Sequence, residues 1–222
     1  MADQPTSRIS SRKAPKQARS TELVSAILEA AIQVLAREGA QRFTTARVAE
    51  KAGVSVGSLY QYFPNKAAIL FRLQSDEWRQ THAMLSDILG DAAKPPLARL
   101  RTLVHAFIRS ECEEAAVRGA LNDAAPLYRD APETKQARAA GAQLFKGFME
   151  EALPAVSASE RALAGNLITT TMSAVGKEFS ERPRTDIEIQ AYADGLADMF
   201  CSFLCAQENS SGAGSPRKPT DR

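Results

Sequence analysis

Apolar residues recur at spacings of three and four along most of the chain, which places them on one face of a helix. Runs that alternate apolar and polar residues, which would indicate strands, are scarce. The sequence therefore predicts an all-α fold. The expected helices cover residues 20–39, 44–52, 55–62, 65–89, 97–108, 137–153, 157–179 and 185–204.

Residues with known preferences for helix ends separate these stretches. Gly39 and Gly53 are suited to end a helix, because glycine adopts the left-handed backbone conformation at little cost. Thr44, Ser55 and Asn65 are suited to begin one, because their side chains can accept hydrogen bonds from free backbone N–H groups. The short segments 44–52 and 55–62 therefore form two helices joined by a turn that contains glycine.

The last two helices begin with capping boxes. Ser157 stands three residues before Glu160, and Thr185 stands three residues before Glu188. In such a pair each side chain accepts a hydrogen bond from the backbone N–H of the other residue. Both helices carry wide apolar faces, which predicts that they are buried against other helices.

Two short helices around a glycine turn are typical of a helix-turn-helix, whose second helix enters the DNA major groove. The outward positions of residues 55–62 are small or hydrogen-bonding, which allows close approach to base edges. We expect Tyr60 and Tyr62 to face DNA, while Leu59 and Phe63 pack inward.

The distribution of charge supports a polyanionic partner for this part of the chain. The net charge of the 222 residues is only +2, but residues 1–66 hold ten Lys or Arg and five Asp or Glu. The rest of the chain is therefore mildly acidic. A basic segment on an acidic body favours nucleic acid as the partner, although a solvated basic tail would look the same.

Composition limits the other classes of function. No apolar run approaches the roughly 18 residues of a membrane span, and the polar N-terminus has no signal-peptide core. The three cysteines are too few and too scattered for a disulfide framework. We therefore expect a cytoplasmic protein with no membrane partner, no metal and no cofactor.

The segment "FTTARVAEKAGVSVGSLYQYFPNKAAIL", preceded by "ILEAAIQVLAREGA", resembles the DNA-binding domain of TetR/AcrR-type (tetracycline-repressor-like) transcriptional regulators. The matching features are the T-T helix start, the A-x-x-A-G-V-S turn, the G-S-L-Y-x-Y-F helix and the N-K start of the next helix. The match covers residues 20 to about 75. It implies a homodimer that binds double-stranded operator DNA and a small-molecule effector.

The resemblance implies four segments and a set of DNA contacts. The segments are a flexible basic arm (1–19), a helix-turn-helix domain (20–66), a helical ligand-binding and dimerisation domain (67–207) and a disordered tail (208–222). Ala46 stands where other members place a basic residue, so Arg47 or the arm is expected to replace that contact. The expected DNA-binding residues are Thr44, Thr45, Arg47, Ser55, Val56, Gly57, Ser58, Tyr60, Gln61, Tyr62 and Lys66.

Aromatic and sulfur-bearing residues in the middle helices are typical of a site for a small apolar effector. At helical spacing the same residues also form plain core, so both interpretations stay open. The candidate ligand-binding residues are Trp78, His105, Phe107, Cys112, Tyr128, Phe145, Met149 and Met172.

The apolar faces of the last two helices are expected to pair with a second copy in a four-helix bundle. The candidate interface residues are Leu167, Thr171, Val175, Tyr192, Leu196, Phe200 and Phe203. Cys201 and Cys205 share a face, which fits either small buried residues or a redox or soft-metal pair.

We expect a ligand-responsive repressor and no catalytic residues. Two alternatives remain: a small helical enzyme, or an effector-free dimeric scaffold that has lost specific DNA binding. The presence of only two histidines and the absence of phosphate-loop and metal motifs disfavour the enzyme. The intact basic arm disfavours the scaffold. Repression rather than activation rests on family analogy alone.

Overall fold

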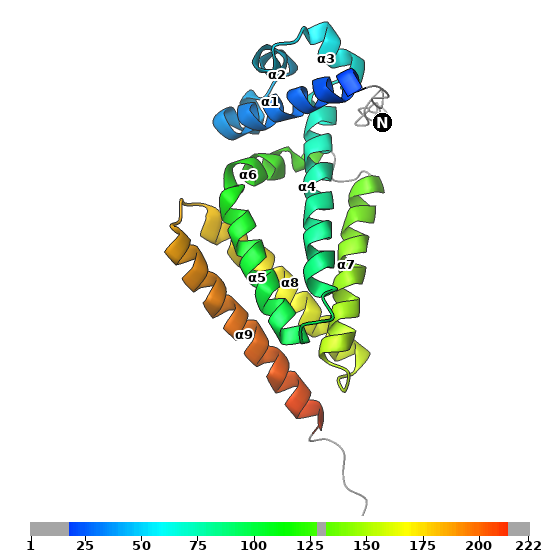
Figure 1. Ribbon diagram of the computed structural model, residues 1–222, viewed down its shortest axis with the longest axis vertical. Coiled ribbons are helices and arrows are strands. Elements are labelled where there is room, and N and C mark those ends of the chain that lie inside the picture. Colours follow the sequence, from blue (N-terminus) through cyan, green and yellow to red (C-terminus); the bar gives the residue numbers. More distant parts are fainter. Residues whose placement is uncertain (1–17, 128–131, 213–222) are drawn as a thin grey trace, which may run out of the picture. The chain divides into compact units, whose positions relative to one another are not determined.

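The computed structural model describes residues 18–127 and 132–212 (Figure 1), and these residues form helices and connecting turns without a strand. The prediction of an all-α fold is confirmed. The helices are α1 (Ala18–Arg42), α2 (Thr45–Ala52), α3 (Val56–Tyr62), α4 (Lys66–Leu89), α5 (Pro96–Glu113), α6 (Ala115–Ala124), the 3-10 turn η1 (Ala125–Leu127), α7 (Pro132–Ala152), α8 (Ala158–Ser180) and α9 (Asp186–Gly212).

Most helix boundaries lie close to the predicted ones, and the differences have local causes. Gly39 adopts a φ of 73° and interrupts α1, as its position in the sequence predicted. The helix α6 was not predicted, because the prolines that follow it suggested a broken stretch. The expected tail from residue 208 is wrong for residues 208–212, which continue α9 because no glycine or proline precedes Gly212 in that segment. The expected arm lies almost wholly outside the described residues.

The described residues divide into two compact units. The first unit holds residues 18–81 together with 116–127 and 132–137, and the second holds residues 82–115 and 138–212. The first unit therefore includes most of α4 as well as the helix-turn-helix segment. Each unit has its own apolar core.

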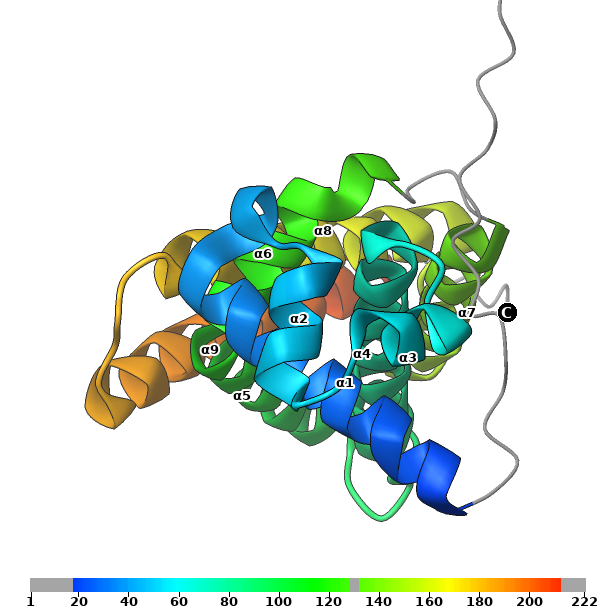
Figure 2. The same ribbon diagram turned by 90° about the horizontal axis from the view of Figure 1, so that it is seen from above.

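The core of the first unit is built where α1, α2, α3 and the start of α4 meet. Phe43, Leu59 and Phe63 are almost completely buried there, with Ile27 and Ile69 beside them. Figure 2 shows α1, α2 and α3 lying next to one another. Since burial of a large apolar side chain contributes about 1.5–3 kcal/mol, this small core is sufficient to fix α3 on α1 and α2.

The core of the second unit lies among α5, α7, α8 and α9. The helix α5 packs along both α8 and α9. On its side toward α9, Arg101 and Arg109 form ion pairs with Asp198 and Asp186, and His105 Nε2 lies 3.1 Å from the carboxylate of Asp194. These contacts follow the antiparallel course of the two helices (Figure 1).

Candidate DNA-binding surface and ligand groove

Side-chain caps fix the two helices of the helix-turn-helix segment. Thr44 Oγ1 accepts a hydrogen bond from the backbone N–H of Arg47 at 3.3 Å, and Ser55 Oγ accepts one from Ser58 at 3.0 Å. Between them, Gly53 has a φ of 67°, so that its N–H can return to the last carbonyls of α2. The turn that the sequence predicted is therefore present with its caps.

Most of the predicted DNA-binding side chains are accessible. Thr45 and Ser58 are half-buried. Exposed are Thr44, Arg47, Ser55, Val56, Gly57, Tyr60, Gln61 and Lys66. The side chains on α3 are small or uncharged, whereas the cations Arg47 and Lys66 lie on α2 and at the start of α4. This arrangement is suited to base contacts from α3 with phosphate contacts on both sides.

A hydrogen bond links the start of α2 to α3. Thr45 Oγ1 and the Tyr60 hydroxyl lie 3.1 Å apart, and either can be the donor. Tyr60 keeps 40% of its surface exposed. Its ring therefore stands on the surface with its hydroxyl oriented by Thr45, as a phosphate or base contact would require.

Tyr62 is not on the outer surface, which corrects the expectation that it faces DNA in the same way as Tyr60. Its side chain is only 7% exposed and packs in the core of the first unit, near Leu59 and Phe63. On a helix Tyr62 lies three residues after Leu59, so the two share the inward face. Only the rim of Tyr62 remains accessible.

Arg47 is paired within the protein. Its guanidinium forms an ion pair with the carboxylate of Glu38 on α1, and both side chains are partly exposed. Arg47 must therefore exchange or share this partner in order to contact a phosphate. Sequence spacing could not reveal this competition, because Glu38 and Arg47 lie on different helices.

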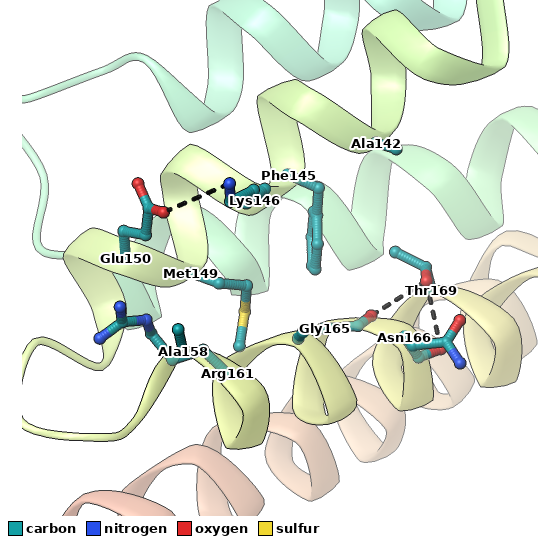
Figure 3. Close-up of a pocket in the computed structure, with 11 residues that line it drawn as sticks. Ala142, Phe145, Lys146, Met149, Glu150, Ala158, Arg161, Gly165, Asn166 and Thr169 are labelled. Atoms are coloured by element: carbon teal, nitrogen blue, oxygen red, sulfur yellow. Dashed lines mark hydrogen bonds and ion pairs between the residues drawn. The ribbon is translucent and has the colours of Figure 1, made fainter.

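A groove of about 280 Å³ lies between α7 and α8 in the second unit (Figure 3). Phe145 and Met149 point from α7 toward Gly165 on α8. A Cβ atom at Gly165 would stand 3.3 Å from Met149 and 3.6 Å from Phe145, so the glycine allows α8 to pack closely against these two side chains. The floor is apolar. The lining residues are Ala142, Phe145, Lys146, Met149, Glu150, Ala158, Arg161, Ala162, Gly165, Asn166 and Thr169.

The polar groups of the groove differ in how strongly they are engaged. Thr169 donates to the carbonyl of Gly165 at 2.9 Å, and Arg161 donates to backbone carbonyls of the α7–α8 loop. Lys146 is exposed and lies 3.9 Å from the carboxylate of Glu150. Lys146 is therefore the cation most able to turn toward a ligand at the rim.

Of the residues predicted to bind the ligand, Phe145 and Met149 line this groove and five others lie elsewhere. Met172 is buried in the core of the second unit, and Phe107 and Cys112 are partly buried against that core. His105 pairs with Asp194 at 3.1 Å. Trp78 packs edge-on against Phe71 in the first unit, and Tyr128 lies outside the described residues.

Sequence reasoning missed the small residues that make the α8 wall. Ala158, Ala162, Gly165 and Thr169 recur at helical spacing, and this row was the available signal. The prediction favoured aromatic and sulfur-bearing side chains instead. Those residues fill cores, whereas a groove needs small residues on at least one side.

The predicted dimer residues lie on two different faces. Leu196 and Phe200 are 8% and 3% exposed and belong to the core of the second unit, so both are already covered within one chain. Thr171, Val175, Tyr192 and Phe203 are half-buried. The exposed large apolar side chains of α8 and α9 are Leu163, Leu167, Ile187 and Met199.

Cys112, Cys201 and Cys205 are free thiols. Burial raises the pKa of the Cys112 and Cys201 thiols, and Cys201 Sγ lies 3.6 Å from the carbonyl of Leu97. No group of three or more metal-ligating side chains is found among residues 18–127 and 132–212. Over the same ranges, none of the helices combines the length and apolar character that a bilayer span requires.

Comparison with family models gives two matches that together cover most of the chain. Residues 27–73 match the model described as bacterial regulatory proteins of the tetR family, and residues 95–207 match the tetracyclin repressor-like C-terminal domain. The first match includes α2 and α3, and the second includes the groove.

Two curated relatives resemble the N-terminal part of the chain. A nucleoid occlusion factor SlmA of Vibrio campbellii is 37% identical over 83 residues, which cover 37% of this chain and 42% of that protein. A fatty acid metabolism regulator protein of Bacillus subtilis is 38% identical over 74 residues, which cover 32% and 38%. The chain thus matches about two fifths of the length of these relatives.

Solved structures share the fold across both units. The fatty acid degradation regulator FadR from Bacillus halodurans has a TM-score of 0.64 at 17% identity, covering 85% of this chain and 97% of that one. FadR from Bacillus subtilis, solved in complex with stearoyl-CoA, has a TM-score of 0.64 at 15% identity, covering 81% and 98%.

Proposed function

The chain belongs to the tetR family of bacterial regulatory proteins, and we propose that it is a repressor released from its operator by a small, largely apolar effector. Membership makes it a DNA-binding transcription regulator and not an enzyme. The operator, the dimer, the effector and the direction of regulation are the proposed parts.

The capped helix-turn-helix is the observation that carries the DNA-binding proposal. The short helix α3 presents Val56, Gly57 and Gln61 to solvent, and its N-terminus is capped by Ser55. A helix with small outward residues can approach base edges in the major groove. Thr44 and Lys66 would then contact phosphates on either side of α3.

A homodimer is supported by the exposed faces of α8 and α9. Leu163 and Ile187 are 71% and 82% exposed, and Leu167 and Met199 are each 51% exposed. Such a concentration of apolar surface on two adjacent helices is best covered by a second copy of the same faces. Two α3 helices about 34 Å apart would then bind the two halves of a palindrome.

The groove between α7 and α8 is the proposed effector site. Its apolar floor and single weakly paired cation, Lys146, suit a compact apolar molecule with one acidic or hydrogen-bond-accepting group. Its volume of about 280 Å³ favours a ligand much smaller than a whole acyl-CoA. The stearoyl-CoA of the structural neighbour supports only the apolar character of the ligand.

Fluorescence anisotropy with a labelled duplex tests the proposal. The duplex comes from the DNA upstream of the chain's own coding sequence, or from a random pool enriched by the wild-type protein. We expect binding that survives a scrambled competitor, weakens with salt and falls about tenfold in Lys66→Ala. Lys177→Ala, an exposed lysine on α8, is the matched control. Equal affinity for the scrambled duplex would instead support the scaffold alternative.

A further inference from the structure

One arginine in the second unit is buried at a cost that needs an explanation. Arg99 is only 2% exposed. Among the described residues, its Nε is buried and has no hydrogen-bond partner. Burying a guanidinium is unfavourable unless its hydrogen bonds are replaced. An incompletely satisfied buried charge is therefore a candidate for a role beyond packing.

The contacts of Arg99 connect three helices. Arg99 stands in the first turn of α5, and one terminal nitrogen donates to the carbonyl of Leu89, the last residue of α4. The other donates to the carboxylate of Glu151 on α7. The guanidinium also lies over the Phe148 ring, 5.7 Å from its centre. Arg99 thus joins the end of α4 to α7.

The two hydrogen-bond acceptors of Arg99 differ in how freely they can move. The carbonyl of Leu89 belongs to a helix end, whereas the carboxylate of Glu151 is on a side chain that is 53% exposed. If α7 shifts, the buried guanidinium must follow the carboxylate of Glu151 or lose that partner. Leaving a buried guanidinium without its carboxylate is unfavourable, so Arg99 transmits a shift of α7 to Leu89.

The same turns of α7 line the proposed effector groove. Phe145 and Met149 form the groove floor, and Phe148 and Glu151 hold Arg99. A ligand that presses against Met149 therefore acts on the helical turn that carries Glu151. Packed helices respond to such pressure by moving as units, because interiors have little free volume.

We propose that Arg99 is a positioning residue that couples occupation of the α7–α8 groove to the C-terminal end of α4. The inference rests on the proposed function of that groove. The helix α4 runs from Lys66 to Leu89 and begins just after the recognition helix α3. A displacement of Leu89 is therefore carried along α4 toward the residues that hold α3.

The test uses a substitution in place of a ligand, since the effector is unidentified. Gly165→Leu places a side chain against Met149 and Phe145, which would lie only 3.3 Å and 3.6 Å from its Cβ atom, and so pushes α7 away from α8 at the groove. Gly147→Leu adds the same side chain to α7 where no atom lies within 4 Å, and is the matched control. Gly165→Ala is the milder filling variant if the leucine prevents folding.

Each filling variant is combined with Arg99→Met, which keeps the length and the packing but removes the charge. Affinity for the enriched duplex is measured by anisotropy, and helical content and Tm are measured for every variant. We expect Gly165→Leu to weaken DNA binding about tenfold with Arg99 present, and less than about threefold in Arg99→Met. Arg99→Lys should restore part of the coupling, and Gly147→Leu should change nothing.

Two results would overturn the inference in different ways. If Gly165→Leu weakens binding equally with Arg99 and with Met at position 99, the groove controls DNA binding but Arg99 does not connect them. If Gly165→Leu leaves the affinity unchanged in the folded wild-type background, the groove is not the effector site, and both the relay and this part of the proposed function fail.

Discussion

In the first unit, side chains close to each other in sequence fix the functional surface. Thr44, Ser55 and Asn65 cap α2, α3 and α4, and each side-chain oxygen accepts a hydrogen bond from the backbone N–H three positions ahead. In the second unit, contacts between distant segments perform this task, such as the pairs of Arg101 with Asp198 and of Arg99 with Glu151. Local caps depend only on residues within one helical turn, whereas the distant contacts depend on how the helices of the second unit pack.

The largest expected effects come from damaging the core of one unit at a time. Phe63→Ala and Phe200→Ala each remove a buried ring, from the first and the second unit respectively. Each should lower the free energy of unfolding by about 3–5 kcal/mol. We expect Phe63→Ala to abolish DNA binding but keep self-association, and Phe200→Ala to weaken self-association.

Anisotropy and analytical ultracentrifugation measure the two properties. Ile32→Ala, at an exposed position on α1, is the control and should change stability by less than about 0.5 kcal/mol. Loss of both properties in Phe63→Ala would mean that the two units do not fold independently.

The next largest expected effects come from replacing one glycine in each unit by alanine. Gly176→Ala would place a Cβ atom 2.8 Å from the Phe107 ring, which forces α5 and α8 apart and costs about 1–3 kcal/mol. At Gly57 the nearest atom to an added Cβ is Ser55 Oγ at 3.8 Å. We therefore expect Gly57→Ala to stabilise α3 by about 0.5–1 kcal/mol while weakening DNA binding.

Urea denaturation and anisotropy separate these effects. Gly195→Ala on α9, where nothing lies within 4 Å of the added atom, is the control for glycine replacement in a helix. Unchanged DNA affinity in Gly57→Ala would show that α3 does not approach the bases closely at this residue.

Removing the ion-pair partner of Arg47 is expected to raise the affinity for DNA, by less than the preceding substitutions lower it. Glu38→Gln removes the carboxylate that holds Arg47 and leaves that cation available to a phosphate. We expect affinity for the enriched duplex to rise severalfold, and the salt dependence to steepen by about one unit of slope. The measurement is anisotropy over a salt series, with Glu29→Gln, an exposed acid elsewhere on α1, as the control. A parallel shift in both variants would attribute the change to net charge alone.

The smallest predicted effect is a pH dependence of the helix caps, which is expected in the second unit but not at the Ser55 cap of the first. Hydrogen bonds from Ser157 lower the pKa of Glu160 below its ordinary value of 4.5, and those from Thr185 lower the pKa of Glu188. Since the folded pKa values are lowered, the stabilisation is complete above pH 4.5 and is lost as pH falls through the lowered values. The cap of Ser55 involves no carboxylate.

We therefore expect the destabilisation caused by Glu160→Gln to be present near pH 6 and to disappear at an acid pH below the lowered pKa of Glu160, where both side chains are neutral. The destabilisation caused by Ser55→Ala, about 1 kcal/mol, should be the same at both pH values. Urea denaturation at the two pH values provides the measurement. A penalty of Glu160→Gln that persists in acid would mean that the charge of Glu160 does not stabilise the cap.

Residue spacing along the chain was enough to predict the all-α fold, the caps at Thr44, Ser55, Ser157 and Thr185, and the family through its helix-turn-helix motif. These features depend on residues within one or two helical turns, so their spacing in the chain is their spacing in space. Periodicity did not reveal that Tyr62 and Phe200 are buried in the cores of their own chain, because it marks an apolar face but does not say what covers that face.

Which faces are free and which charges meet became visible from the packing of the helices and not from the spacing of residues. Glu38 with Arg47 and Arg99 with Glu151 are pairs between helices, and the groove beside Gly165 exists because small residues on α8 face large ones on α7. The physical reason is that such contacts depend on how helices cross, and the crossing is set by the packing of the whole core.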